Sequence, residues 1–140
     1  MTDFLLDTNV VSELRKASSG RADPRVLAWV AAVPAERMHL SAISLLEIEQ
    51  GVMSMERRDP RQGRVLREWL EHQVVPAFEG RFVPVDAHVA RRCAALHVEE
   101  PRPERDALIA ATALVHGMTV VTRDVAGFRP TGVPIVNPWA

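Results

Sequence analysis

The 140-residue chain is poor in cysteine and has no long apolar segment. The only cysteine, Cys93, excludes an internal disulfide bond, and its place in an apolar helical pattern predicts a core residue in a reducing compartment. No apolar run approaches the length needed to span a bilayer. The segment 1–7 lacks the basic start and apolar stretch of a signal peptide. We therefore expect a cytoplasmic protein that makes no contact with a membrane.

Lysine is also nearly absent. The formal net charge is -1, so no global field draws the chain onto nucleic acid. Of the 17 basic residues only Lys16 is a lysine. Arginine suits bidentate contact with phosphate, although a GC-rich coding genome is the simpler explanation for this bias. An apolar fraction of 47% is enough for a proper core, and the length predicts one domain, residues 1–140.

Several familiar functional motifs are missing. The sequence has no glycine-rich phosphate loop and no nucleophile elbow. The five histidines show no metal-ligand spacing with one another or with Cys93, so we expect them at the surface or at helix ends. We find no internal repeat and no low-complexity tract.

Short apolar runs alternate with helical patterns along the chain. The expected strands are Phe4–Leu6, Met38–Ser41, Phe82–Val85, Val120–Thr122 and Ile135–Val136. A continuous apolar run such as the first is typical of a strand buried on both faces, as in a parallel sheet. The pattern predicts an α/β fold, a three-layer α/β/α domain with a mostly parallel central sheet.

Four acidic residues stand where strands end or helices begin: Asp7, Glu47, Asp106 and Asp124. Such places converge at the carboxyl edge of a parallel sheet. Carboxylates gathered there repel one another unless a cation or shared protons hold them together. All-oxygen ligation favours Mg²⁺ or Mn²⁺ over zinc or copper. The sequence therefore predicts a divalent metal site and metal-assisted chemistry on phosphates.

Each of these acids also has an ordinary structural interpretation. Asp7 and Asp124 are placed to act as turn residues or helix N-caps. Asp106 lies early in a helix, where a carboxylate interacts favourably with the helix dipole, and Glu104 would serve that purpose equally well. Only the joint arrangement of the acids favours a metal site over these interpretations.

Glu47 has two interpretations that depend on where its helix begins. Ser44 and Glu47 fit a capping box, in which the glutamate reaches back to the cap. If the helix begins at Ser41 instead, Glu47 lies in the second turn, beyond the reach of a capping box. Glu49 is the competing acid, but two positions along a helix turn it well away from Glu47.

Five segments resemble motifs of one known family in the same order: FLLDTNVVSE at 4–13, SLLEIEQG at 44–51, DALIAATA at 106–113, VTRDVAGF at 121–128 and NPW at 137–139. They resemble the PIN-domain family, and within it the VapC and FitB-like toxin nucleases of bacterial type II toxin–antitoxin modules. The likeness spans nearly the whole chain. It implies a PIN-like α/β/α domain.

The resemblance also implies an activity and its residues. The positions that match the family's acidic site are Asp7, Glu47, Asp106 and Asp124, of which the last is the least constant in the family. Thr122 matches a supporting hydroxyl residue, and Thr8 could do likewise. The implied protein is a toxin that hydrolyses RNA phosphodiester bonds as an Mg²⁺- or Mn²⁺-dependent endoribonuclease.

Binding partners follow from the same resemblance. The family relation implies a homodimer and a cognate VapB-like antitoxin, whose C-terminal segment fills the groove and blocks the site in a hetero-oligomer. Arg105 and Arg123 are the arginines nearest in sequence to the acids, so we expect them to hold flanking RNA phosphates, unless they are simply solvated surface.

Two other functions stay open from the residues. A haloacid-dehalogenase-type phosphatase also places an aspartate after the first strand, but it usually needs a second one at the position of Asn9 and a suitable lysine. A non-catalytic RNA- or partner-binding module would use its carboxylates merely as caps. This hypothesis predicts that Asp7→Asn changes the stability of the protein and that there is no catalytic turnover for it to affect.

Overall fold

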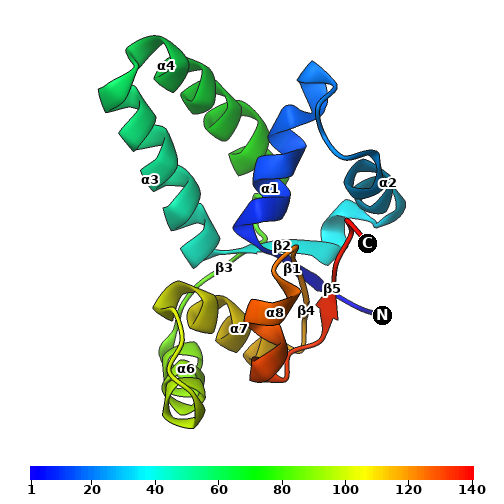
Figure 1. Cartoon of the computed structure of the whole chain (residues 1–140), viewed down its shortest axis with the longest axis vertical. Helices are drawn as coiled ribbons and strands as arrows, with labels where there is room; N and C mark the ends of the chain where they lie inside the picture. Colours follow the sequence, from blue (N-terminus) through cyan, green and yellow to red (C-terminus); the bar gives the residue numbers. More distant parts are fainter.

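The computed structural model describes residues 1–140, and its five strands form one parallel sheet (Figure 1). The strands are β1 Phe4–Leu6, β2 Met38–Ser41, β3 Phe82–Val83, β4 Thr119–Val121 and β5 Ile135–Val136. Their order is β3-β2-β1-β4-β5, and every neighbouring pair is parallel. The predicted α/β class and parallel sheet are confirmed, although β3 ends at Val83, two residues earlier than expected.

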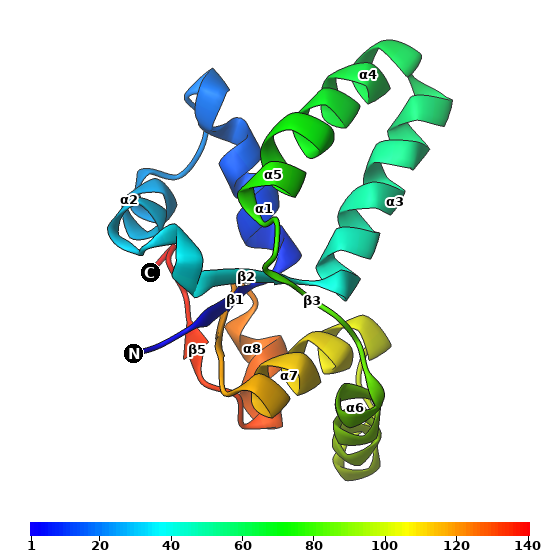
Figure 2. The same cartoon turned by 180° about the vertical axis from the view of Figure 1, so that it is seen from behind.

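Helices cover both faces of this sheet, which gives three layers (Figures 1 and 2). On one face lie α1 Thr8–Arg15, α2 Pro24–Ala32, α3 Ala42–Arg58, α4 Pro60–Trp69 and α5 Val75–Ala77. On the other lie α6 Ala87–Glu99, α7 Glu104–His116 and α8 Val125–Phe128. Shorter turns are the 3₁₀ segments η1 Lys16–Ser19, η2 Ala35–Arg37 and η4 Arg129–Thr131, and the π turn η3 Leu70–Val74.

The two faces of the sheet are packed by alternate residues of the same strands. Leu5 and Val120 are paired in register and pack with α6 and α7. Leu6 and Val121 are paired next to them and pack with α1 and α3. All four side chains are fully buried, as the alternation of side chains along a strand between two helical layers requires.

The central strand β1 lies where the strand order changes direction. The chain proceeds from β1 to β2 on one side and places β4 on the other. In such sheets the carboxyl ends of the strands at this switch point form the crevice where ligands bind. Asp7 follows β1 at this position, and its backbone N–H donates to the carbonyl of Val121 at 2.9 Å.

Helices α3 and α4 form a hairpin that projects from the sheet (Figure 1). Asp59 begins α4 by accepting a hydrogen bond from the backbone N–H of Gln62 at 3.3 Å. Arg67 on α4 pairs with Glu49 and Glu56 on α3, at 2.7 and 2.9 Å. Residues 58–60 therefore form a tight turn between two paired helices.

Cys93 is buried in the cluster beneath α6 and α7, which confirms its predicted place in the core. None of the helices combines the length and the apolar character that crossing a lipid bilayer would require.

Candidate active site

Asp7 is both a helix cap and the most buried acid of the site. Its Oδ1 accepts a hydrogen bond from the backbone N–H of Thr8 at 2.8 Å, which starts α1. Its Oδ2 accepts from the Thr122 hydroxyl at 2.8 Å and from Asn9 Nδ2 at 3.3 Å. The residue is only 7% exposed. The capping interpretation is thus correct, and the carboxylate is held rigidly at the sheet edge at the same time.

Thr122 and Asn9 join two turns that are distant in sequence. The Thr122 hydroxyl accepts from Asn9 Nδ2 at 3.2 Å and from the backbone N–H of Asp124 at 3.0 Å. Asn9 Oδ1 accepts from the backbone N–H of Arg123 at 3.4 Å. This role of Asn9 was not predicted from the sequence. The available signal was its position in the first turn of α1, two residues beyond Asp7.

Glu47 enters the site from the second turn of α3. The helix begins at Ala42, after Ser41 accepts a hydrogen bond from the backbone N–H of Ile43 at 3.0 Å. The capping-box interpretation is therefore wrong, and the Ser44 hydroxyl is buried without a hydrogen-bond partner. Glu47 Oε1 instead accepts from the Thr8 hydroxyl at 2.8 Å.

The competing acid, Glu49, points elsewhere, because its carboxylate pairs with Arg67 at 2.7 Å. Thr8 supports Glu47, so both threonines expected to support carboxylates do contact one.

Asp106 and Asp124 come from the opposite layer. Asp106 is the third residue of α7 and is partly buried. Asp124 follows β4 and caps α8, where its Oδ1 accepts from the backbone N–H of Gly127 at 3.1 Å. A Cβ at Gly127 would meet the Asp124 carboxylate, so a substitution there would displace this side chain from its present position.

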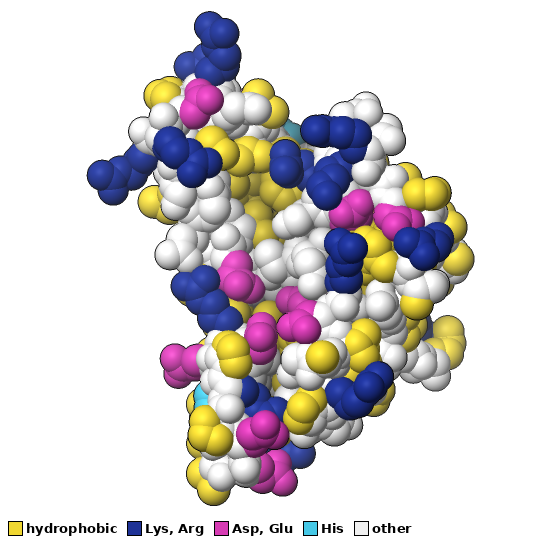
Figure 3. Space-filling model, in the orientation of Figure 1, with side chains coloured by type: hydrophobic (Ala, Val, Ile, Leu, Met, Phe, Trp, Pro, Cys, Tyr) yellow, Lys and Arg dark blue, Asp and Glu magenta, His cyan; other side chains and the backbone are white.

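The four carboxylates lie near enough to repel one another. Burial raises the pKa of Asp7 above its ordinary value, and the charges of Asp106 and Glu47 raise that pKa further, while the Thr122 and Thr8 hydrogen bonds lower it. Burial also raises the pKa of Asp106, and the charges of Asp124 and Glu47 add to it. Figure 3 shows acidic side chains gathered on this face of the molecule.

The donor set fits a hard divalent cation. All four candidate ligands are carboxylates, a set that suits Mg²⁺ or Mn²⁺ better than zinc. No three acidic, histidine or cysteine side chains converge closely enough to enclose an ion by themselves. Mg²⁺ usually binds through one or two carboxylates and keeps several water ligands, which agrees with this open spacing.

The two arginines expected near the acids behave differently. Arg105 lies at the site, where its Nη1 is 3.8 Å from Glu47 Oε2 and its Nη2 donates to Gln50 Oε1 at 3.0 Å. The Arg123 guanidinium lies over the ring of Trp139, 5.5 Å from its centroid. Their phosphate-binding roles stay predictions.

The family model described as PIN domain matches residues 4–131, a range that contains all four acids. The chain belongs to the PIN-domain family. This PIN-domain chain is 40% identical to VapC ribonuclease Y4jK of Sinorhizobium fredii over 97% of both proteins. It is 38% identical to toxin FitB of Neisseria gonorrhoeae, over 97% of this chain and 98% of FitB.

Solved structures have the same fold. The crystal structure of FitAcB from Neisseria gonorrhoeae contains a chain with a TM-score of 0.86 and 36% identity, over 97% of this PIN-domain chain and 98% of that chain. The fold extends to distant proteins, since VapBC-1 from nontypeable Haemophilus influenzae matches with a TM-score of 0.73 at 17% identity over 99% of this chain and 100% of that chain.

Proposed function

We propose that this protein is a metal-dependent endoribonuclease that acts as the toxin of a type II toxin–antitoxin module. One observation carries the proposal: carboxylates from four separate segments lie at the carboxyl edge of the sheet, near enough for their charges to raise the pKa values of Asp7 and Asp106. Similar proteins named as a VapC ribonuclease and a toxin support it. Metal sites of this kind assist hydrolysis of phosphodiesters.

Each acid has a part in this proposal. Asp7 and Asp106 would hold Mg²⁺ or Mn²⁺, and Glu47 and Asp124 would complete the site directly or through water. When bound, the ion would lower the pKa of a water molecule and offset charge on the phosphate. Asp124, the exposed member of the group, would hold a second metal ion or orient the attacking water.

The hydroxyl and amide groups around the acids set their orientation. Thr122 and Asn9 fix Asp7, and Thr8 fixes Glu47. Partners of this kind hold metal-binding carboxylates in one rotamer, and their loss typically weakens metal affinity or activity 10- to 100-fold.

The products offer a direct test. Hydrolysis adds a water oxygen to phosphorus and releases the 3′ oxygen, so each cut would leave a 5′-phosphate and a 3′-hydroxyl. We expect purified protein to produce these ends from RNA in Mg²⁺ or Mn²⁺, and to release no phosphate from a small aryl phosphate. A 2′,3′-cyclic phosphate product, or full activity in excess EDTA, would contradict the proposed chemistry.

The partners belong to the proposal as well. Two similar solved structures are FitAcB from Neisseria gonorrhoeae and FitAB bound to an IR36 DNA fragment. We expect a VapB-like antitoxin to cover this site with its C-terminal segment and the toxin itself to form a homodimer in the cytoplasm. Light scattering at micromolar concentration tests the homodimer, and a monomer there would refute it.

A further inference from the structure

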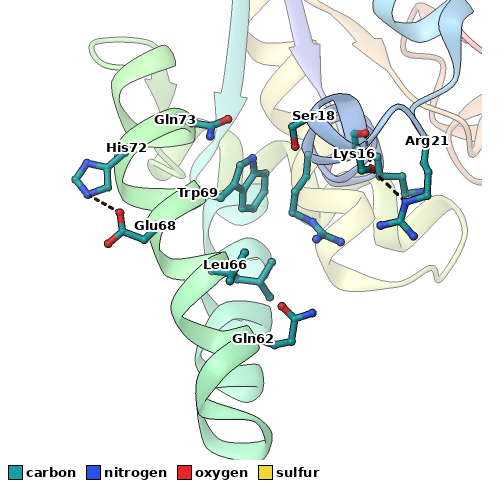
Figure 4. A pocket seen from close by; sticks show the side chains of 12 residues that line it. Lys16, Ser18, Arg21, Gln62, Leu66, Glu68, Trp69, His72 and Gln73 are labelled. Carbon is teal, nitrogen blue, oxygen red and sulfur yellow. Dashed lines mark hydrogen bonds and ion pairs between the residues drawn. The ribbon is translucent and has the colours of Figure 1, made fainter.

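A cleft leads away from the acidic site between α1–η1 and α4. Its outer part is a cavity of about 570 Å³ between these two walls (Figure 4). Its inner part, about 180 Å³, is bordered by Thr8 and Glu47 of the acidic site. Both parts share Arg15, Leu66 and Trp69 as lining residues. The two cavities therefore lie next to each other, and the inner one borders the carboxylate of Glu47.

The outer part of the cleft is basic. Arg15 ends α1, Lys16 begins η1 and Arg21 follows η1, and all three line this part of the cleft. Lys16 pairs with Glu13 at 3.1 Å. Neither Arg15 nor Arg21 forms an ion pair with a carboxylate of the chain, so both charges are available. The single acid in the lining, Glu68, is highly exposed and pairs with His72 at 3.3 Å.

The facing wall offers groups that suit nucleic-acid bases. The ring of Trp69 lies between α4 and the η1 wall, with Gln62 and Gln73 on the same side of the cleft (Figure 4). Aromatic rings stack on bases of any sequence, and side-chain amides hydrogen-bond to base edges. The cleft thus offers cationic groups for a phosphate, an aromatic ring for the face of a base and amide groups for its edge. These are the parts that an unpaired nucleotide exposes.

Charge changes sign along the cleft. The acids lie at the inner end, and Lys and Arg side chains line the hollow above them (Figure 3). Asp7 and Arg15 are separated by the length of α1, about 12 Å at the rise of an α-helix. The basic group therefore lies farther along the cleft than the acids, where it would contact a phosphate next to the one at the acids.

We propose that this cleft binds the single-stranded RNA next to the scissile phosphate, with Arg15 and Arg21 on backbone phosphates and Trp69 stacked on a base. The assignment rests on the proposed nuclease function and adds a substrate subsite to it. The chain as a whole carries a net charge of -1, so its overall charge does not attract RNA. The basic residues of the cleft would provide that attraction locally.

The salt dependence of RNA binding tests the phosphate contacts. Binding of a fluorescein-labelled single-stranded RNA is followed by anisotropy in an Asp106→Asn background, which prevents cleavage during the titration. The double variant Arg15→Ala with Arg21→Ala should make the slope of log K against log[salt] less steep by about 1.4, or about 0.7 for each lost contact.

The matched control is Arg91→Ala with Arg92→Ala. These exposed residues lie on α6, on the opposite face of the sheet, and removing them changes the net charge by the same amount. The slope of this control should equal that of the parent. An equal decrease in both double variants would mean that only overall charge matters, which would overturn the proposed subsite.

Tryptophan fluorescence tests the stacking contact in a variant that keeps an aromatic ring for packing. RNA should quench the fluorescence of the parent protein, and Trp69→Phe should abolish most of this quenching. Trp29→Phe should retain it, because Trp29 packs edge-to-face on Phe4, with centroids 5.0 Å apart, in the α2 layer. Quenching that survives Trp69→Phe would refute the stacked base.

Two further outcomes separate the subsite from the function. The wild type could cleave RNA while the Arg15 and Arg21 double variant keeps the parent's slope of log K against log[salt]. In that case the proposed subsite is wrong and the nuclease function stands. If an acidic peptide, and not RNA, loses affinity in that double variant, the cleft belongs to a protein partner and the subsite is again overturned.

Discussion

The Thr122 hydroxyl donates a hydrogen bond to Asp7 Oδ2 at 2.8 Å, across 115 positions of sequence. The bond joins the turn after β1 to the turn after β4, two strands that lie side by side in the sheet. Both side chains are buried, so water does not compete strongly for this contact. Thr122 therefore sets the direction in which the Asp7 carboxylate faces the other acids.

Removing this support should reduce activity while the fold persists. We expect Thr122→Val to lower RNA cleavage 10- to 100-fold, because the Asp7 carboxylate loses one of the bonds that orient it. Asn9→Ala should have an effect of similar size. The matched control is Thr112→Val, since the buried Thr112 hydroxyl bonds only to the Leu108 carbonyl within α7. Equal losses of activity in Thr122→Val and Thr112→Val would contradict a specific role for Thr122.

Protonation of the acids should make stability depend on pH. Burial raises the folded-state pKa of Asp106, so the folded protein binds more protons than the unfolded chain between the two pKa values. The free energy of unfolding therefore falls as pH rises through that window, and the cost is complete above the folded-state pKa. Without metal, Asp106→Asn should raise the melting temperature at neutral pH. The gain should disappear near the ordinary carboxyl pKa, and a gain independent of pH would contradict this origin.

Metal binding should stabilise the folded protein. A ligand at 100 times its dissociation constant adds about 2.7 kcal/mol to the free energy of unfolding, which for a chain of this length raises the melting temperature by roughly 8 °C. We expect this shift with Mg²⁺ or Mn²⁺ in the wild type and not in Asp7→Asn. Asp59→Asn, at the remote tip of the α3–α4 hairpin, should keep the full shift. A shift retained by Asp7→Asn would place the ion elsewhere.

The α3–α4 hairpin depends on close contact between its helices. A side chain at Gly63 would collide with the backbone of Glu56, so Gly63→Ala should destabilise the protein by about 1–3 kcal/mol. Gly51→Ala is the matched change, because nothing lies near its added methyl group in α3, and it should stabilise by about 0.5–1 kcal/mol. Urea denaturation of both variants measures the difference, and equal effects would disprove the close contact.

Much of this arrangement could be predicted from local patterns. The run Phe4–Leu6 followed by Asp7 identified a buried strand and the residue at its end, because apolar continuity and capping chemistry are local signals. The start of α3 was ambiguous for the same reason. Both Ser41 and Ser44 fit a cap, and only the pairing of β2 as far as Ser41 decides between them.

Contacts between distant segments could not be read from the sequence. Asn9 reaches Thr122 only because β1 and β4 are neighbours in the sheet, and no local pattern encodes that adjacency. The position of Arg123 over Trp139 has the same origin. The basic side of the cleft was not predicted from the sequence. Arg15 and Arg21 line the cleft only because η1 faces α4 in the fold.

The most direct test is cleavage of total RNA by purified protein free of any antitoxin, in Mg²⁺, in Mn²⁺ and in EDTA, beside Asp7→Asn and Asp106→Asn. We expect cleavage with either metal and none in EDTA. Both variants should lose at least about 100-fold in rate, because a misplaced ion costs several kcal/mol of transition-state stabilisation. Circular dichroism must show that both remain folded. Undiminished cleavage by either folded variant, or no cleavage by the wild type with any metal across several RNA pools, would contradict a metal-dependent nuclease centred on these carboxylates.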